Sequence, residues 1–248
     1  MINFENIIGG IYRMKVPFED NYTAVFLVCT DNGDILIDSA TTKNDAEKFI
    51  IPALERMGKS PKFAICTHDH GDHAGGMPYV LAHFEEMKPY AASEMLINTQ
   101  KYAPIRDGIE ILDGVVILSL PGHSPDSVGI FDLKTKTLIS GDSVQLGGVG
   151  RYGTGIWNGA EYYRSLDKIL SLDAENLITS HDYYPLGSIA MGRPALENYI
   201  SESKKIAMEI GELAKKIGAD EAARIYNESV PSRPPISTAS AKALIIFS

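Results

Sequence analysis

Apolar residues in the first part of the chain come in short runs separated by turn residues, a pattern typical of β-strands. The strongest run is Tyr22–Thr30. The Asn-Gly pair at 32–33 connects it to a return strand over 35–38, because this pair tolerates the positive φ of a hairpin turn. An earlier strand is predicted over 7–12 and a loop over 17–21. The chain therefore begins with strands and turns.

Farther along, apolar runs alternate with segments in which apolar residues recur every three or four positions, the spacing of an amphipathic helix. The predicted strands cover residues 63–66, 89–92, 115–120, 128–132, 137–140 and 177–180. The predicted helices cover residues 44–57, 77–87, 93–100 and 160–170, and an irregular segment is expected over 102–114. Strands that cluster in two halves with helices between them indicate an α+β fold of two stacked sheets flanked by helices.

The pattern changes at Arg193, after which the only regular periodicity is helical. One apolar stripe predicts a long helix packed on the rest of the protein, and it consists of Leu196, Tyr199, Ile200, Ile206, Ile210, Leu213 and Ile217. Gly218 ends this helix, and a short second helix is predicted over 220–229. We therefore predict a main domain over 1–192 and a C-terminal helical extension over 193–248.

Composition sets further limits on the class of protein. The 248 residues are 44% hydrophobic, which suits one large domain with an extension, and no run of eighteen apolar residues predicts a membrane span. The N-terminus lacks the order of a secretion signal, so a cytoplasmic location is expected. A net charge of −9 opposes binding to nucleic acid. The apolar segment 241–247 is expected to be buried or to form a subunit contact of a homodimer.

Three of the six histidines fall in one short segment, directly after a predicted strand. The segment contains His68, His70, Asp72 and His73, and a glycine pair then leads into a predicted helix. Imidazole and carboxylate groups at this spacing are typical ligands of zinc, iron or manganese. A short loop at the end of a strand holds such ligands rigidly. We interpret the cluster as ligands for two adjacent metals.

Three more polar residues follow predicted strands in Gly, Ser or Pro contexts, namely His123, Asp142 and His181. The candidate metal ligands are therefore His68, His70, Asp72, His73, His123, Asp142 and His181. The remaining histidine, His83, lies off the apolar face of its helix and is predicted to be at the surface. Cys29 and Cys66 are predicted to be small core residues rather than a disulfide.

This combination of motifs resembles the metallo-β-lactamase superfamily over roughly residues 20–185. The matching motifs are His68-x-His70-x-Asp72-His73, Gly122-His123-Ser124, Ser140-Gly141-Asp142 and Ser180-His181. The resemblance implies a four-layer αβ/βα sandwich with a two-metal site. It also implies a first metal bound by His68, His70 and His123, a second metal bound by Asp72, His73 and His181, and Asp142 as a ligand of both.

Within the superfamily, the motif pattern is most similar to the glyoxalase II (hydroxyacylglutathione hydrolase)-like group. β-Lactamases with a cysteine ligand have it where this chain has Asp142, and another lactamase branch lacks the bridging aspartate. Flavodiiron proteins have glutamate where this chain has His70. The chain departs from the glyoxalase II group at Asp126, where glycine is usual, and its C-terminal part lacks that group's basic glutathione-contacting residues.

The ligand set predicts hydrolytic chemistry. Two divalent cations about 3.5–4 Å apart share a water and lower its pKa to roughly 7. We therefore expect a binuclear metal-dependent hydrolase that uses a metal-bridging hydroxide on a small-molecule thioester, ester or lactone. Asp72 and Asp142 are the catalytic candidates, and no serine or cysteine nucleophile is needed. Zinc is the expected metal, with iron or manganese as alternatives.

Several residues are candidates for other roles around the centre. Tyr183, Arg151 and Tyr152 are the predicted substrate-binding residues, although Tyr183 could equally pack its own loop. The glycine-rich segment 147–155 lacks the Gly-Lys-Ser/Thr ending of a phosphate loop, so we expect it to form a flexible rim. The hydroxyls expected to orient the metal ligands belong to Ser124, Ser143 and Ser180.

Three alternative functions are also compatible with the sequence. A mononuclear iron dioxygenase acting on persulfides would use the same ligands. A phosphodiesterase of the same superfamily is a second alternative, although the acidic composition and the lack of an RNA-binding module oppose it. A metal-bound scaffold without turnover is the third, and the intact ligand set argues against it.

Overall fold

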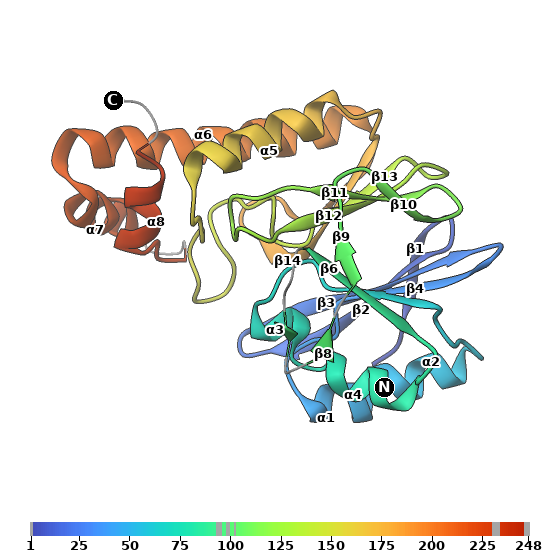
Figure 1. The fold of residues 1–248 in the computed structure, drawn as a ribbon. Helices are drawn as coiled ribbons and strands as arrows, with labels where there is room; N and C mark the ends of the chain where they lie inside the picture. Colours follow the sequence, from blue (N-terminus) through green and yellow to red (C-terminus); the bar gives the residue numbers. More distant parts are fainter. Residues whose placement is uncertain (1, 93–95, 98–99, 102, 230–233, 246–248) are drawn as a thin grey trace. The chain divides into compact units, whose positions relative to one another are not determined.

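A computed structural model of the protein gives its fold, and it describes residues 2–92, 96–97, 100–101, 103–229 and 234–245 (Figure 1). The predicted α+β class is confirmed, with two mixed sheets and a set of C-terminal helices. The chain divides into two compact units. The N-terminal unit comprises residues 1–119 and 130–135, and the C-terminal unit comprises residues 120–129 and 136–248. The boundary between residues 192 and 193 stays a prediction.

The N-terminal unit is built on a seven-stranded sheet with the order β1-β2-β3-β4-β5-β6-β9. Its strands are β1 (Glu5–Ile8), β2 (Ile11–Phe18), β3 (Asn21–Thr30), β4 (Gly33–Ile37), β5 (Phe63–Ile65), β6 (Lys88–Ala92) and β9 (Ala103–Ile105). The first four pair antiparallel, as hairpins allow, and the last three join in parallel. Parallel neighbours require long crossover connections, and the helices of this unit supply those from β4 to β5 and from β5 to β6.

Helices cover one face of this sheet. They are α1 (Lys43–Asp45), the π-helical turn η1 (Ala46–Ile50), α2 (Ile51–Arg56), α3 (Gly71–Ala74) and α4 (Met77–His83). A capping box between Thr42 and Asp45 starts α1, and Gly58 follows the last turn of α2 with a φ of 65°, so the predicted helix over 44–57 is confirmed. Ile50 and Leu54 are fully buried in the apolar core that the helices share with the sheet.

A second sheet has six strands in the order β10-β11-β12-β13-β14-β15. The strands are β10 (Ile109–Leu112), β11 (Val115–Ser119), β12 (Val128–Asp132), β13 (Thr137–Ile139), β14 (Asn176–Tyr183) and β15 (Gly187–Ala190). The helices of the C-terminal unit are α5 (Gly159–Ser171), α6 (Arg193–Ile217), α7 (Ala219–Ser229) and α8 (Thr238–Ala243). The predicted helices over 160–170 and 193–217 are thus confirmed, and they run side by side (Figure 1).

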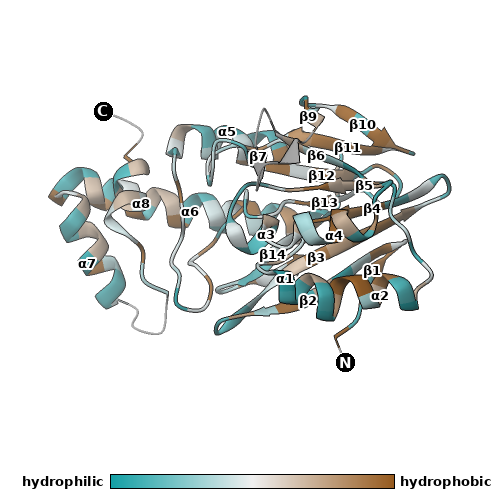
Figure 2. Ribbon diagram, turned by 60° about the horizontal axis from the view of Figure 1, so that its bottom comes forward, coloured by the Kyte–Doolittle hydropathy of each residue, from teal (hydrophilic) through white to brown (hydrophobic). Residues whose placement is uncertain are grey.

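The C-terminal helices are amphipathic. Alternating polar and apolar bands along α6 and α7 are visible in Figure 2. The predicted apolar stripe of α6 is largely buried, with Leu196, Ile200 and Ile210 all inaccessible to solvent. None of the helices within the described residues has the length and apolarity that a membrane span requires.

Two predictions for the first strands are wrong. The strand expected over 7–12 is interrupted, because Gly9 and Gly10 adopt positive φ and form the turn between β1 and β2. The loop expected over 17–21 is a tight hairpin, since β2 runs through Pro17 to Phe18 and pairs there with the start of β3. Pro17 is tolerated because β1 pairs with β2 only as far as Arg13, so that Pro17 lies where β2 pairs with β3 alone.

The segment between β6 and β11 also differs from the prediction. The helix expected over 93–100 falls partly outside the described residues, and the described part contains the short strands β7 (Leu96–Ile97) and β8 (Gln100–Lys101). The segment expected to be irregular, 102–114, contains β9 and β10. These strands are too short to carry a clear alternation, so strand pairing rather than local pattern defines them.

Shortening a buried leucine tests the core of the N-terminal unit. Leu54→Ala removes a fully buried side chain and leaves a cavity, so we expect the free energy of unfolding to fall by about 2–5 kcal/mol. Leu133→Ala is the matched control, because Leu133 is 50% exposed and its loss should change stability by less than about 0.5 kcal/mol. Urea denaturation measures both, and equal effects of the two substitutions would contradict the assigned core.

Candidate metal centre

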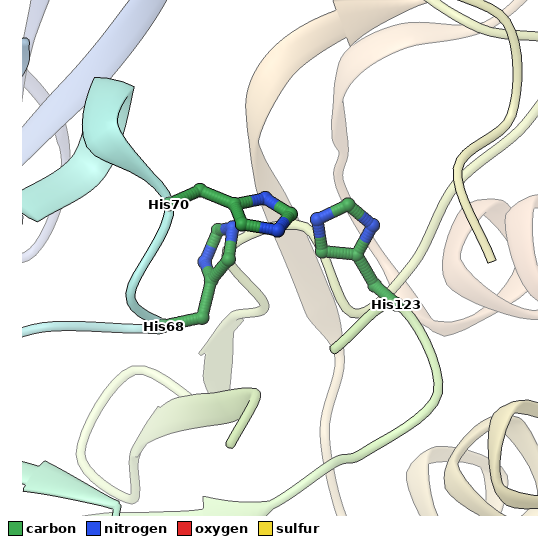
Figure 3. Close-up of side chains that lie close together, drawn as sticks. All are labelled: His68, His70 and His123. Atoms are coloured by element: carbon green, nitrogen blue, oxygen red, sulfur yellow. The ribbon is translucent and has the colours of Figure 1, made fainter. Parts of the chain in front are cut away.

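Four of the predicted ligands lie together in the N-terminal unit, on the segment between β5 and α4. Rings of His68 and His70 have centroids 4.5 Å apart, and those of His68 and His73 are 4.2 Å apart. Asp72 Oδ2 is 3.4 Å from His73 Nε2. Figure 3 shows His68 and His70 projecting from this segment. We call His68, His70, Asp72 and His73 the first ligand cluster.

Two glycines fix the path of this segment. A Cβ on Gly75 would overlap the carbonyl oxygen of Thr41, and one on Gly76 would overlap that of Ser39. No other residue fits at either position without moving the backbone. The backbone N–H of Ser39 donates to the carbonyl of His73 at 2.7 Å. The ligand segment is therefore held against the chain that follows β4.

One carboxylate that the sequence analysis missed orients two of these imidazoles. Asp38 is completely buried, and its Oδ2 accepts from His73 Nδ1 at 2.8 Å and from the Thr67 hydroxyl at 2.9 Å. Its Oδ1 accepts from the Thr67 backbone N–H at 2.8 Å. Since the Thr67 hydroxyl donates to Asp38, it accepts from His68 Nδ1, 3.1 Å away. Both imidazoles therefore direct Nε2 away from these partners, as metal-binding histidines do.

Asp72 is positioned by a strand on the other side of the cluster. The hydroxyl of Thr23, in β3, donates to Asp72 Oδ2 at 3.2 Å. The Asp72 side chain is 18% exposed, whereas that of His73 is fully buried. The first ligand cluster thus combines the buried residues His68 and His73 with the exposed His70 and with a carboxylate that solvent reaches.

The other three predicted ligands lie together in the C-terminal unit. His123 comes from the segment between β11 and β12 (Figure 3), and Asp142 follows β13. Asp142 Oδ2 lies 3.8 Å from His123 Nε2 and 3.5 Å from His181 Nε2. We call these three residues the second ligand cluster. One expectation is wrong in detail, because β14 extends to Tyr183 and His181 therefore lies within the strand rather than after it.

His123 is also held through its other ring nitrogen. Nδ1 lies 2.6 Å from the carbonyl oxygen of Gly155 and 2.7 Å from the side-chain nitrogen of Gln145. The carbonyl can only accept, so the imidazole tautomer that donates from Nδ1 leaves Nε2 available to a metal. His123 thus repeats the arrangement found at His68 and His73.

The spacing within both clusters fits cation ligands better than hydrogen-bonded pairs. Donor atoms that bind one tetrahedral cation at about 2.1 Å lie roughly 3.4 Å apart, beyond the ~2.7–3.2 Å of a good N–H···O bond. The carboxylate–imidazole distances at Asp72 and Asp142 are 3.4, 3.5 and 3.8 Å. Nitrogen and carboxylate oxygen donors suit zinc, iron and manganese alike. The residues present therefore fit divalent metal ions.

Comparison with known proteins agrees with these clusters. The family model of the metallo-beta-lactamase superfamily matches residues 19–105 and 104–181, which include all seven predicted ligands. The chain belongs to the metallo-β-lactamase superfamily. It is a hydrolase, and its family relationship implies divalent metal binding. The fold and the resemblance that the sequence predicted are thereby confirmed.

The curated relatives include hydroxyacylglutathione hydrolases. The enzyme of Photorhabdus laumondii is 28% identical over 207 residues, covering 80% of this chain and 77% of its own length. That of Salmonella dublin is 28% identical over 199 residues, covering 78% of this chain and 74% of its own. This metallo-β-lactamase superfamily member is therefore similar to glyoxalase II enzymes over most of its length.

Solved structures agree on the fold. The FIM-1 metallo-β-lactamase from Pseudomonas aeruginosa, in its mono-zinc form, matches with a TM-score of 0.65 and 18% identity, covering 82% of this chain and 95% of its own. A metallo-β-lactamase family protein from Thermus thermophilus matches with a TM-score of 0.66 and 19% identity, covering 96% of this chain and 91% of its own. At these identities the likeness concerns the metallo-β-lactamase fold alone.

The serines do not fill the role expected of them. The Ser124 hydroxyl donates to Asp126 at 2.6 Å and lies 2.6 Å from that of Ser127, so it is directed to these two residues rather than to a ligand. The buried hydroxyls of Ser143 and Ser180 have no hydrogen-bond partner among the described residues. Orientation of the imidazoles comes instead from groups that sequence reasoning missed, which are Asp38, Thr67, Gln145 and the Gly155 carbonyl.

Two of the predicted substrate-binding residues are exposed, and the third is not. Arg151 and Tyr152 lie on a turn closed by two backbone hydrogen bonds between Val149 and Tyr152, and Tyr152 is 46% exposed. Backbone bonds between Tyr184 and the glycines at 147 and 148 connect this loop to the end of β14. Tyr183 is buried with its ring edge-on to His181, which favours the alternative that it packs its loop.

The carboxylate of Asp38 can be tested through metal affinity. Asp38 has a φ of 60°, which asparagine also tolerates, so Asp38→Asn preserves the backbone. In one orientation its amide nitrogen would face the Thr67 hydroxyl and His73 Nδ1, and in the other the Thr67 backbone N–H, all of which are donors. We therefore expect metal affinity to fall roughly 10–100-fold. Competition with a chromophoric chelator measures this affinity.

Asp34→Asn is the matched control, because Asp34 lies in β4 and pairs with Lys59 at 3.0 Å rather than with a ligand. It should leave metal affinity unchanged. Wild-type affinity in the Asp38→Asn protein would contradict the role assigned to Asp38.

Proposed function

We propose that this protein is a binuclear metal-dependent hydrolase of small thioesters, with esters and lactones as related substrates. The observation that carries the proposal is the position of Asp142. One of its carboxylate oxygens faces both His123 and His181, at 3.8 and 3.5 Å. A carboxylate placed between two imidazoles suits a bridging ligand, and a bridging ligand requires two metals.

The proposed centre combines the two ligand clusters. His68, His70 and His123 would hold one metal, Asp72, His73 and His181 the other, and Asp142 both. One family model spans the two clusters, which supports their joint use. We propose zinc as the metal, because nitrogen and oxygen ligands in this number suit it.

The chemistry follows from what each residue does. Divalent metals bound there would polarise a carbonyl oxygen and lower the pKa of a bound water to about 7. Asp38, Thr67 and the Gly155 carbonyl fix the imidazole tautomers, so that Nε2 is the donor atom. Asp142 is 7% exposed, which keeps its charge in a site of low dielectric. Asp72, which solvent reaches, is the second proposed catalytic carboxylate.

The proposed substrate class comes from the relatives and from the rim of the C-terminal unit. Two relatives at 28% identity are hydroxyacylglutathione hydrolases. Arg151, exposed on its turn, would pair with a substrate carboxylate, and the neighbouring Tyr152 would supply a hydroxyl and an apolar ring. We also propose a cytoplasmic location, no nucleic-acid partner and a homodimer.

The first test is hydrolysis of S-lactoylglutathione by the zinc-reconstituted protein. We expect turnover that chelation abolishes and zinc restores. Asp142→Asn should lower kcat/KM by roughly 10³-fold, because metal catalysis contributes several kcal/mol to the transition state. Metal analysis should give two ions per chain. Hydrolysis at the same rate by metal-depleted protein, or oxygen uptake with a persulfide at one iron per chain, would contradict the proposal.

A second test concerns the rim of the site. Arg151→Ala should raise KM about tenfold with little change in kcat, since it removes one charge-assisted contact, roughly 1.4 kcal/mol, from ground and transition states alike. Arg164→Ala is the control, because Arg164 is exposed on α5 and pairs with Glu161 instead. Steady-state kinetics compare the two, and an unchanged KM for Arg151→Ala would exclude Arg151 from the substrate site.

A further inference from the structure

A buried glutamine connects the C-terminal helices to one of the metal ligands. Gln145 is 3% exposed and lies in the chain between Asp142 and the glycine-rich loop. Its side-chain oxygen accepts from the backbone N–H of Gly155 at 2.6 Å, and its side-chain nitrogen lies 2.7 Å from His123 Nδ1. Because Nδ1 donates to the Gly155 carbonyl, it cannot also accept from the amide nitrogen. Gln145 therefore acts on the imidazole through Gly155, whose backbone N–H its side-chain oxygen accepts.

Two hydroxyls on helices hold the backbone of Gln145. The Tyr162 hydroxyl, from α5, accepts from the Gln145 N–H at 3.0 Å and donates to the Gln145 carbonyl at 2.8 Å. The Ser203 hydroxyl, from α6, donates to the same carbonyl. Burial raises the pKa of Tyr162 to about 12, so this phenol keeps its proton at any pH at which the protein is folded and active.

The C-terminal segment also holds the other neighbour of His123. The backbone N–H of Ile156 donates to the Ser240 hydroxyl of α8 at 3.2 Å. A Cβ on Gly153 would overlap the Pro235 carbonyl oxygen, so the loop packs directly on this segment. A Cβ on Gly155 would approach the His123 ring to 3.4 Å, so the small residue lets the backbone reach the imidazole.

We propose that Gln145 is a positioning residue for the metal ligand His123, and that Ser203 and Ser240 of the C-terminal helices hold Gln145 and the Gly155 loop in register with it. The proposal rests on the metal centre of the proposed function. It gives the C-terminal helices a role in metal binding, in addition to their packing.

The chemistry of the amide makes a specific prediction possible. A metal on His123 Nε2 requires the ring to donate from Nδ1, and Gly155 O is its acceptor. A glutamate at position 145 would offer acceptors to both the Gly155 N–H and His123 Nδ1, whereas a leucine would offer neither. Metal affinity should therefore survive Gln145→Glu and fall in Gln145→Leu.

The experiment titrates metal-free full-length protein with zinc in a chelator competition and follows cobalt absorption as a report of coordination. Gln145→Leu should lose roughly 10–100-fold in affinity, as loss of an outer partner of a metal-binding histidine does, with a changed cobalt spectrum. Gln145→Glu should fall no more than about threefold below wild type, because the carboxylate keeps an acceptor for the Gly155 N–H. Wild-type affinity in Gln145→Leu, or an equal loss in both variants, would overturn the proposal.

Variants on α6 keep the proposal testable if Gln145→Leu fails to fold. Ser203→Ala should lower zinc affinity by a smaller factor of about 2–10, the value of one hydrogen bond. Tyr199→Phe is the matched control, because it removes an α6 hydroxyl whose bond goes to the Gly187 carbonyl, and it should leave affinity unchanged. Equal affinities in these two variants would overturn the proposal.

A wild-type protein that binds two metals without hydrolysing thioesters would refute the proposed function and leave this inference standing.

Discussion

The ligand segment of the N-terminal unit depends on the buried carboxylate of Asp38. A carboxylate in a fully buried position must be satisfied by donors, and here three of them converge on it from Thr67 and His73. The Asp38 carboxylate only accepts hydrogen bonds, so the Thr67 hydroxyl and His73 Nδ1 must both donate to it. The Thr67 hydroxyl is then left to accept from His68 Nδ1. One side chain at the end of β4 thus determines which nitrogen two imidazoles present.

In the C-terminal unit, neutral groups determine which nitrogen the imidazole presents. His123 Nδ1 donates to the backbone carbonyl of Gly155 in place of a carboxylate, and the side-chain oxygen of Gln145 holds Gly155 through its N–H. Neutral partners are less costly to bury than a charge, but they orient the ring only if they are themselves immobile. This requirement explains why Gln145 makes backbone hydrogen bonds to both Tyr162 and Ser203, and why the Gly155 loop is packed against the segment at Pro235.

The sequence identified the family and the candidate ligands, but not the groups that orient them. Histidines and aspartates after strands are a local signal, so these candidates could be recognised from the sequence. Asp38 lies 35 positions before His73 in sequence, and the two meet only because β4 and β5 pair in parallel. The sequence does show Gln145 as a polar residue between the apolar residues Val144 and Leu146. Only the tertiary structure identifies the residues that it contacts. The three serines were expected to orient metal ligands because they are adjacent to those ligands in sequence. Adjacency in sequence does not determine where a hydroxyl points.

The errors in the fold have a related cause. Strand β3 was predicted because ten residues carry its pattern, whereas β9 and β10 have three and four residues and are defined by their neighbours. The extension of β14 through His181 matters more for function. The pairing of β14 with β15 shifts register between Ile178 and Tyr183, and His181 lies in this irregular stretch with its Nε2 3.5 Å from Asp142 Oδ2. Irregular pairing at a functional residue is a common use of bulges, since it redirects one side chain without ending the strand.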